Sequence, residues 1–139
     1  MIDLAISLSG PLVDVLLPIT LHTLRQHEKL NDVNLHFVDK DCEPHIRNWL
    51  DEYVEHNWGF VHDFQSPNRF TIGCPVQSDD KRIERDVVNG TVSTLGWMTQ
   101  NCGSQEWIFI AHFDLEFTTP WLSRLRSWVA DDVGQVGDH

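Results

Sequence analysis

Short runs of apolar residues along the chain predict β-strands, because each run is bounded by residues that favour turns. The last of these runs is apolar on both faces, which is typical of a central strand in a parallel sheet. The second alternates apolar and polar positions and ends in acid at Asp39. The runs cover residues 4–9, 33–39, 60–64 and 107–113, with a shorter candidate at 70–72.

Apolar residues at helical spacing predict helices between these strands. The first predicted helix contains Pro18, so it either kinks at that proline or begins there. Asp41 is placed to cap the second helix, and Thr118 or Thr119 to cap the last, with Pro120 opening it. The apolar stripes of the helices span residues 13–24, 46–54, 83–98 and 121–129.

The alternation of strands and helices predicts an α/β fold of three layers, with a mostly parallel, Rossmann-like sheet covered on both faces. The length of 139 residues suits one domain. In such sheets ligands bind at the carboxyl ends of the strands. The residues to examine first are therefore Ser9, Gly10, residues 39–41 and residues 112–116.

The composition of the chain argues against several classes of function. Lys and Arg number 10 against 21 Asp and Glu, so the net charge of −11 argues against a nucleic-acid partner. Three cysteines without a CxxC motif indicate reduced thiols in a cytoplasmic protein. We expect no membrane span, because no apolar run is long enough. The absence of GxGxxG and GxxxxGK argues against dinucleotide dehydrogenases and P-loop NTPases.

The strongest chemical signal is the segment His112-Phe113-Asp114-Leu115-Glu116. In an extended chain its three polar side chains point the same way, roughly 6–7 Å apart for each step of two. Carboxylates and an imidazole beside a sheet suit magnesium or manganese. The alternative is a strand that ends in solvent with charges that alternate by chance. For His112, satisfaction within the core is also open.

Acid at the end of a second strand favours the first interpretation, because parallel strands would bring both ends to one edge. Asp39 has no local partner in the sequence, so we expect it to bind a ligand. Asp41 is more readily explained as a helix cap.

These pieces together resemble the N-terminal half of a GT-A-type glycosyltransferase of the family 2 kind, over residues 4–10, 35–41 and 107–121. The resemblance implies a nucleotide-sugar site. Asp39 matches the acid that contacts the nucleotide base, with Asp41 in the same nucleotide-binding group. Ser9 and Gly10 match residues that lie against the base or ribose.

The resemblance also implies a metal site. Asp114-x-Glu116 matches the Asp-x-Asp motif that binds the ribose and a divalent cation, manganese or magnesium, on the diphosphate. In an alternative register the motif is His112-x-Asp114. Both registers include Asp114. Neither holds two Asp residues, which leaves metal dependence open.

We therefore expect a metal-assisted glycosyltransferase that passes the sugar of a nucleotide-diphospho donor to an acceptor hydroxyl. Members of this family continue into an acceptor-binding half, and we expect residues 1–139 to form a single donor-binding domain without it, so no catalytic base is assigned. One alternative is a non-catalytic nucleotide- or sugar-binding module that works with a partner. Another is an unrelated acidic α/β domain.

Two further expectations concern surfaces. Uncovered edges of a parallel sheet favour a homo-oligomer. Trp58 and Trp97 lie off the helix stripes, so they are candidates for an acceptor or dimer contact.

Overall fold

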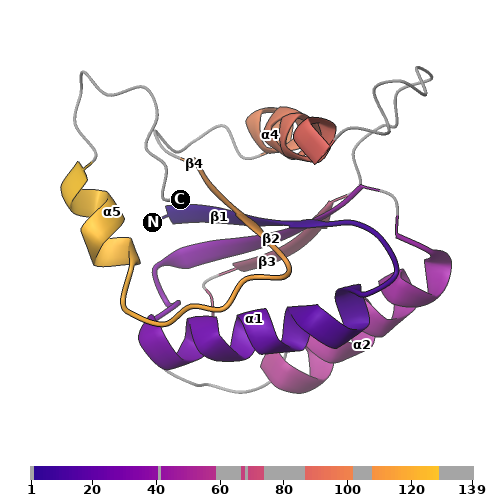
Figure 1. The fold of residues 1–139 in the computed structure, drawn as a ribbon, viewed down its shortest axis with the longest axis horizontal. Helices are drawn as coiled ribbons and strands as arrows, with labels where there is room; N and C mark the ends of the chain where they lie inside the picture. The colour runs from indigo at the N-terminus through magenta and orange to yellow at the C-terminus, as the bar shows by residue number, and fades with distance from the viewer. Residues whose placement is uncertain are drawn as a thin grey trace.

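The computed structural model describes residues 2–40, 42–58, 67, 69–73, 87–101 and 108–128. Strands and helices alternate along this part of the chain (Figure 1). They are β1 (Ile2–Leu8), α1 (Val13–His27), β2 (Val33–Asp39), α2 (Pro44–Trp58), β3 (Arg69–Gly73), α4 (Val87–Asn101), β4 (Ile108–His112) and α5 (Leu122–Trp128). The strand predicted at residues 60–64 lies outside the described residues, whereas the short strand predicted at 70–72 is present as β3.

The strands form one sheet in the order β3-β2-β1-β4, and every pair of neighbours is parallel. Helices α1 and α2 lie on one face of this sheet and α4 lies on the other (Figure 1). The predicted three-layer α/β fold is confirmed. Within the described residues, no helix is both long enough and apolar enough to cross a membrane.

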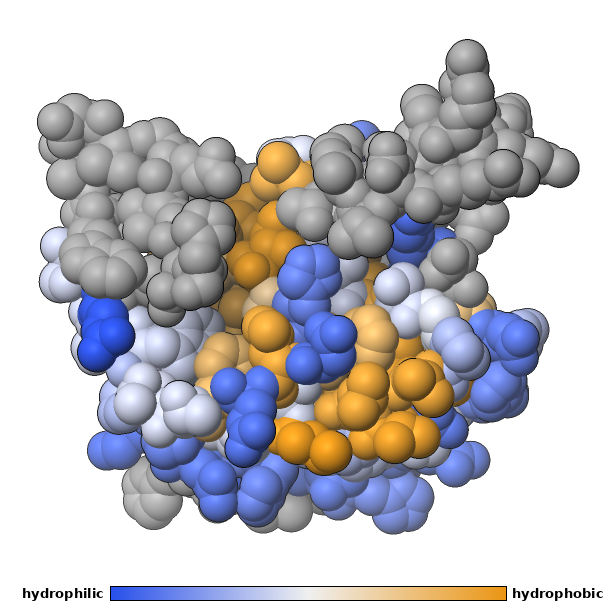
Figure 2. Space-filling view, viewed as in Figure 1, coloured by the Kyte–Doolittle hydropathy of each residue, from blue (hydrophilic) through white to orange (hydrophobic). Residues whose placement is uncertain are grey.

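Helix α1 begins at Val13 and includes Pro18, so the helix does not begin at that proline. The helix follows a tight turn after β1. Gly10 has a φ of 78°, a left-handed conformation that glycine adopts at little cost, and it turns the chain from β1 directly into the helix. The inner side of α1 is buried, and its outer side also carries apolar residues (Figure 2).

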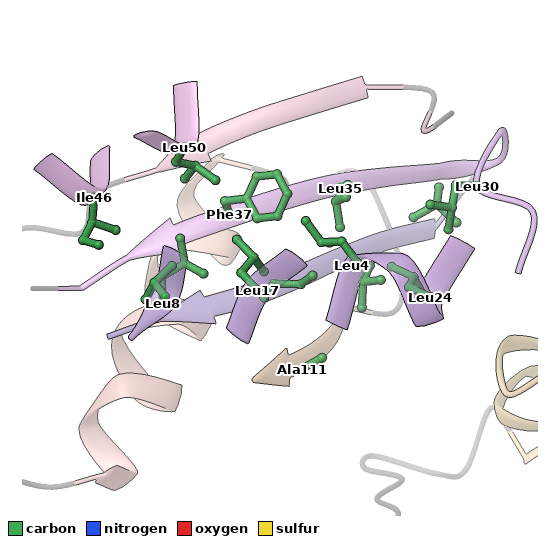
Figure 3. Packing of buried hydrophobic residues seen from close by; sticks show 14 of the residues in the cluster. Leu4, Leu8, Leu17, Leu24, Leu30, Leu35, Phe37, Ile46, Leu50 and Ala111 are labelled. Carbon is green, nitrogen blue, oxygen red and sulfur yellow. The ribbon is translucent and has the colours of Figure 1, made fainter. Parts of the chain in front are cut away.

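The main core lies between α1, α2 and the sheet. Alternate residues of β1 and β2, Leu4 and Phe37 among them, face this layer, where Figure 3 shows them against Leu17 and Leu24 of α1. The remaining residues of the strands face α4, where Ala5 and Val38 pack on Met98. Because both faces are covered, β1 and β2 are buried along almost their whole length.

The last helix is capped from a distance. Helix α5 begins at Leu122, and Glu28 Oε1 accepts hydrogen bonds from the backbone N–H groups of Trp121 (2.5 Å) and Leu122 (2.9 Å). The prediction that Thr118 or Thr119 caps this helix is therefore wrong. A carboxylate satisfies the first N–H groups of a helix and also complements its dipole, and here it comes from the end of α1.

Candidate functional site

The carboxyl ends of β1, β2 and β4 meet at one edge of the sheet, which we call the carboxyl edge. Leu8 of β1 pairs with Asp39 at the end of β2, and Ser7 pairs with His112 at the end of β4. Asp39 and His112 therefore end the two strands that flank β1, one residue apart in register. This pairing agrees with the expectation that parallel strands bring the two ends to one edge.

Asp39 and His112 approach the carboxyl edge from opposite faces of the sheet. Their partners, Leu8 and Ser7, are consecutive residues, and consecutive side chains of a strand point to opposite faces. The two strands are also separated by β1, a spacing of about 10 Å at ~4.8 Å per strand. One ion cannot bind both side chains across that spacing, whereas an extended ligand that crosses the end of β1 can touch both.

The turn after β1 lies between these two side chains. Ser9 is exposed, and a Cβ placed on Gly10 would meet nothing within 4 Å. The backbone N–H of Lys40 donates to the Leu8 carbonyl at 3.1 Å, which keeps the end of β2 beside this turn. Ser9 and Gly10 thus follow β1 beside the end of β2; their role in nucleotide binding, which the resemblance implies, stays a prediction.

Asp39 does have a local partner, contrary to the sequence-based argument. It is only 7% exposed, and its Oδ1 accepts a hydrogen bond from the Cys42 backbone N–H at 2.9 Å. This contact orders the turn between β2 and α2. A carboxylate has two oxygens, each of which can accept hydrogen bonds. Asp41 lies outside the described residues.

The segment after β4 does not continue as an extended strand. The strand ends at His112, and the chain turns at residues 113–114. The Thr20 hydroxyl oxygen lies 2.6 Å from the carbonyl oxygens of both Phe113 and Leu115. Further along, the Phe117 N–H donates to Thr23 Oγ1 at 3.0 Å. Hydroxyl groups of α1 therefore draw this segment back along the helix (Figure 1).

This path separates the three residues predicted to bind metal, all of which are exposed. Glu116 lies between the contacts to Thr20 and Thr23, which stand seven and ten residues beyond the start of α1. At 1.5 Å per residue these positions are about 10 and 15 Å along the helix. Asp114 stands between Phe113 and Leu115, whose carbonyl oxygens both contact Thr20, so its backbone also lies beside Thr20. Both registers, His112-x-Asp114 and Asp114-x-Glu116, therefore stay predictions.

Among the described residues, no group of three or more His, Cys, Asp and Glu side chains is close enough together to hold a metal ion. Magnesium, however, is commonly held by one or two carboxylates together with water and substrate phosphates. Two protein ligands near the edge, such as His112 and Asp114, are compatible with that mode. Metal binding at Asp114, Glu116 and His112 stays a prediction.

A hydroxyl pair beside the edge was not found from the sequence. Thr94 Oγ1 of α4 donates to Ser7 Oγ at 3.1 Å, and both side chains are buried. Ser7 pairs with His112 and precedes the last residue of β1, so this bond lies near the carboxyl edge. The hydroxyl of Ser7 among the apolar residues of β1 was a signal in the sequence. Its partner Thr94 could be identified only from the fold.

A second buried polar cluster lies farther from the edge. Asp3 Oδ1 accepts from Asn34 Nδ2 at 3.0 Å and lies 2.9 Å from His36 Nε2. The His36 ring is fully buried, with its centroid 6.1 Å from that of Trp97. These contacts link β1 to β2 beneath α4. They explain why a histidine stands in a buried strand, and they place it away from the candidate site.

Trp97 acts in packing rather than at a surface site. A Cβ placed on Gly73 would lie 2.3 Å from Trp97 Cε2, so the ring lies directly against the β3 backbone. Trp97 thus fills the layer between α4 and the sheet, and the expectation that it lines an acceptor or dimer contact is not supported. The side chain of Trp58 lies outside the description.

Comparisons with protein-family models, curated proteins and solved structures found no match.

Proposed function

We propose that the chain binds a nucleotide-diphospho sugar across the carboxyl edge and transfers the glycosyl group to an acceptor hydroxyl. One observation carries the proposal: Asp39 and His112 end the two strands that flank β1, and they face opposite sides of the sheet. A ligand that touches both must be long, with chemically different ends. A nucleoside diphosphate meets this requirement, because its base and ribose offer hydrogen-bond donors and its diphosphate attracts cations.

Each end of the ligand has a candidate partner. Asp39 Oδ2 accepts from the base or ribose, and the Ser9–Gly10 turn lies against the nucleoside. His112 and Asp114 hold a divalent cation, manganese or magnesium, on the diphosphate, with Glu116 as the ligand of the other register. The cation supplies Lewis-acid stabilisation of the negative charge that builds on the leaving diphosphate. It also offsets the repulsion between phosphates and a chain of net charge −11.

The acceptor side of the reaction is less defined. Transfer requires a base that removes the proton of the acceptor hydroxyl, and we assign this step to no described residue. A second candidate function follows from this gap: a non-catalytic module that binds the same donor and works through a partner. Release of nucleoside diphosphate, measured with and without added acceptors, separates the two.

Thermal-shift titration tests donor binding. UDP and GDP are added with and without manganese, and a ligand at a hundredfold excess over its Kd stabilises the fold by about 2.7 kcal/mol. We expect stabilisation by one of the two nucleotides, increased by manganese. Asp39→Asn should weaken it, because the variant retains an oxygen for the Cys42 N–H but loses the charge. The control is Asp51→Asn, an exposed acid on α2. Lack of response to either nucleotide would refute the proposal.

We further propose that the chain self-associates and that it is located in the cytoplasm. Within the described sheet, β3 and β4 are the outer strands, and unpaired strand edges favour pairing with another chain. Light scattering of the purified chain across a concentration series tests this part.

A further inference from the structure

The outer face of α1 carries a row of apolar side chains that the fold leaves in solvent. Leu12, Val15 and Ile19 are 54%, 59% and 52% exposed, and Leu115 is 40% exposed. Leu12, Val15 and Ile19 are separated by three and four residues, so their side chains lie on one side of the helix over about two turns. We call these four residues the apolar ridge. Figure 2 shows apolar side chains gathered over α1.

Leu115 belongs to this surface although it is distant in sequence. Its carbonyl lies 2.6 Å from the hydroxyl of Thr20, the residue after Ile19. The contact brings the segment that follows β4 against the side of α1. The apolar ridge is thus a single surface formed by two segments, and it borders Asp114 and Glu116, the candidate cation ligands proposed above.

Carboxylates stand on both sides of the apolar ridge. Asp14 directly precedes Val15 and is therefore turned about 100° around α1 from it. On the other side, Asp114 and Glu116 flank Leu115 and are exposed. A surface with apolar side chains between carboxylates is complementary to a partner surface with apolar side chains between Lys or Arg residues.

This charge pattern distinguishes the possible occupants. In a two-fold dimer the same patch faces itself, which would bring these carboxylates together, and like charges across an interface are costly. An anionic membrane surface would meet the same repulsion. A basic amphipathic helix would place apolar residues on the ridge and Lys or Arg beside the carboxylates.

We propose that the apolar ridge docks a basic amphipathic helix of a partner protein. This inference does not depend on nucleotide binding. The ridge extends only from Leu12 to Ile19 along α1, about 10 Å at 1.5 Å per residue. Such a contact is smaller than standard interfaces, so binding is weak and falls as salt screens the exposed charges.

Fluorescence anisotropy with two synthetic helices tests this docking. One labelled peptide of about five turns carries Leu at i, i+3, i+4 and i+7 with Lys elsewhere, and the other carries Glu in place of Lys. We expect the Lys peptide to bind at least about tenfold more tightly, a difference of about 1.4 kcal/mol. Ile19→Ser should weaken it about tenfold. Leu95→Ser is the matched control, because Leu95 is 46% exposed on α4, across the sheet.

Charge reversal supplies a second test. Glu116→Lys should weaken binding of the Lys peptide and strengthen binding of the Glu peptide, while urea unfolding checks that each variant remains folded. Equal binding of both peptides, or an equal loss in Ile19→Ser and Leu95→Ser, would overturn the proposal. So would a wild-type dimer that Ile19→Ser dissociates in light scattering, because a second copy would then cover the ridge.

Discussion

Asp39 and His112 reach the same edge of the sheet from its two faces. Their β1 partners are the consecutive residues Leu8 and Ser7, and β1 keeps the two side chains about 10 Å apart. The relationship sets the kind of ligand that can use both: one that lies across the end of β1. The proposed nucleotide-sugar site rests on this arrangement.

The two registers of the metal motif predict different effects of substitution. In manganese–UDP titrations, Asp114→Asn should lose the increase in stabilisation that manganese gives. Glu116→Gln should keep it if His112 and Asp114 hold the cation, because Glu116 is four residues from His112 along the chain. Thermal shifts at fixed UDP with rising manganese measure both. Loss in Glu116→Gln would restore the Asp114-x-Glu116 register, and an unchanged manganese effect in Asp114→Asn would remove Asp114 from the site.

Two glycines should respond in opposite directions to alanine. Gly73→Ala places a Cβ in the Trp97 ring, and overpacking of this kind costs about 1–3 kcal/mol. At Gly96, inside α4, a Cβ meets nothing within 4 Å, so alanine should stabilise the helix by about 0.5–1 kcal/mol. Urea unfolding gives both values. If Gly73→Ala is as stable as the parent, Trp97 does not pack as described.

The distant cap of α5 predicts a loss of stability on removal of Glu28. Glu28→Ala leaves the N–H groups of Trp121 and Leu122 without their acceptor, and loss of a cap costs about 0.5–2 kcal/mol. Glu55, exposed on α2, provides the control, since Glu55→Ala should change stability by about 0.5 kcal/mol or less. Equal urea midpoints for the two variants would contradict the cap.

Burial raises the pKa of Tyr53 above its usual 10.0, and the Arg25 charge only partly opposes this. The folded state therefore retains the phenol proton to higher pH than the unfolded state. This stabilisation is complete below pH 10 and is lost as pH rises through the pKa of the folded state. Tyr53→Phe should show no such loss in urea unfolding from about one pH unit below to about one unit above the usual tyrosine pKa of 10.0.

The chain has a single tyrosine, so tyrosinate absorbance reports Tyr53 alone. Its titration midpoint should be higher in the native protein than in urea. Coincident midpoints in the two states would contradict the pKa shift.

Local pattern was enough to predict much of the fold. The alternation over residues 33–39 predicts β2 with the bounds that the structure gives, because one residue in two must face each helical layer. The run that predicts β4 is apolar on both faces for the same reason. The parallel pairing then followed from the order of strands and helices.

The contacts that shape the site depend on residues far apart in sequence. The turn at residues 113–114 is stabilised by Thr20, and a threonine inside an amphipathic helix gives no sign of a partner beyond β4. Ser7 and Thr94 meet only because α4 packs on the sheet. Asp39 is different: its bond to the Cys42 N–H is local, and aspartate side chains often accept from backbone N–H groups a few residues away, so this bond could have been expected from the sequence.

Nuclear magnetic resonance of the labelled chain during titration with UDP or GDP and magnesium tests the central claim most directly. We expect the amide signals of Gly10, Lys40, His112 and Asp114 to shift together with one affinity, while those of Thr99 and Asn101 at the end of α4 stay in place. Shifts confined to one side of β1, or no shifts at the carboxyl edge with either nucleotide, would contradict the binding of a nucleotide across the end of β1.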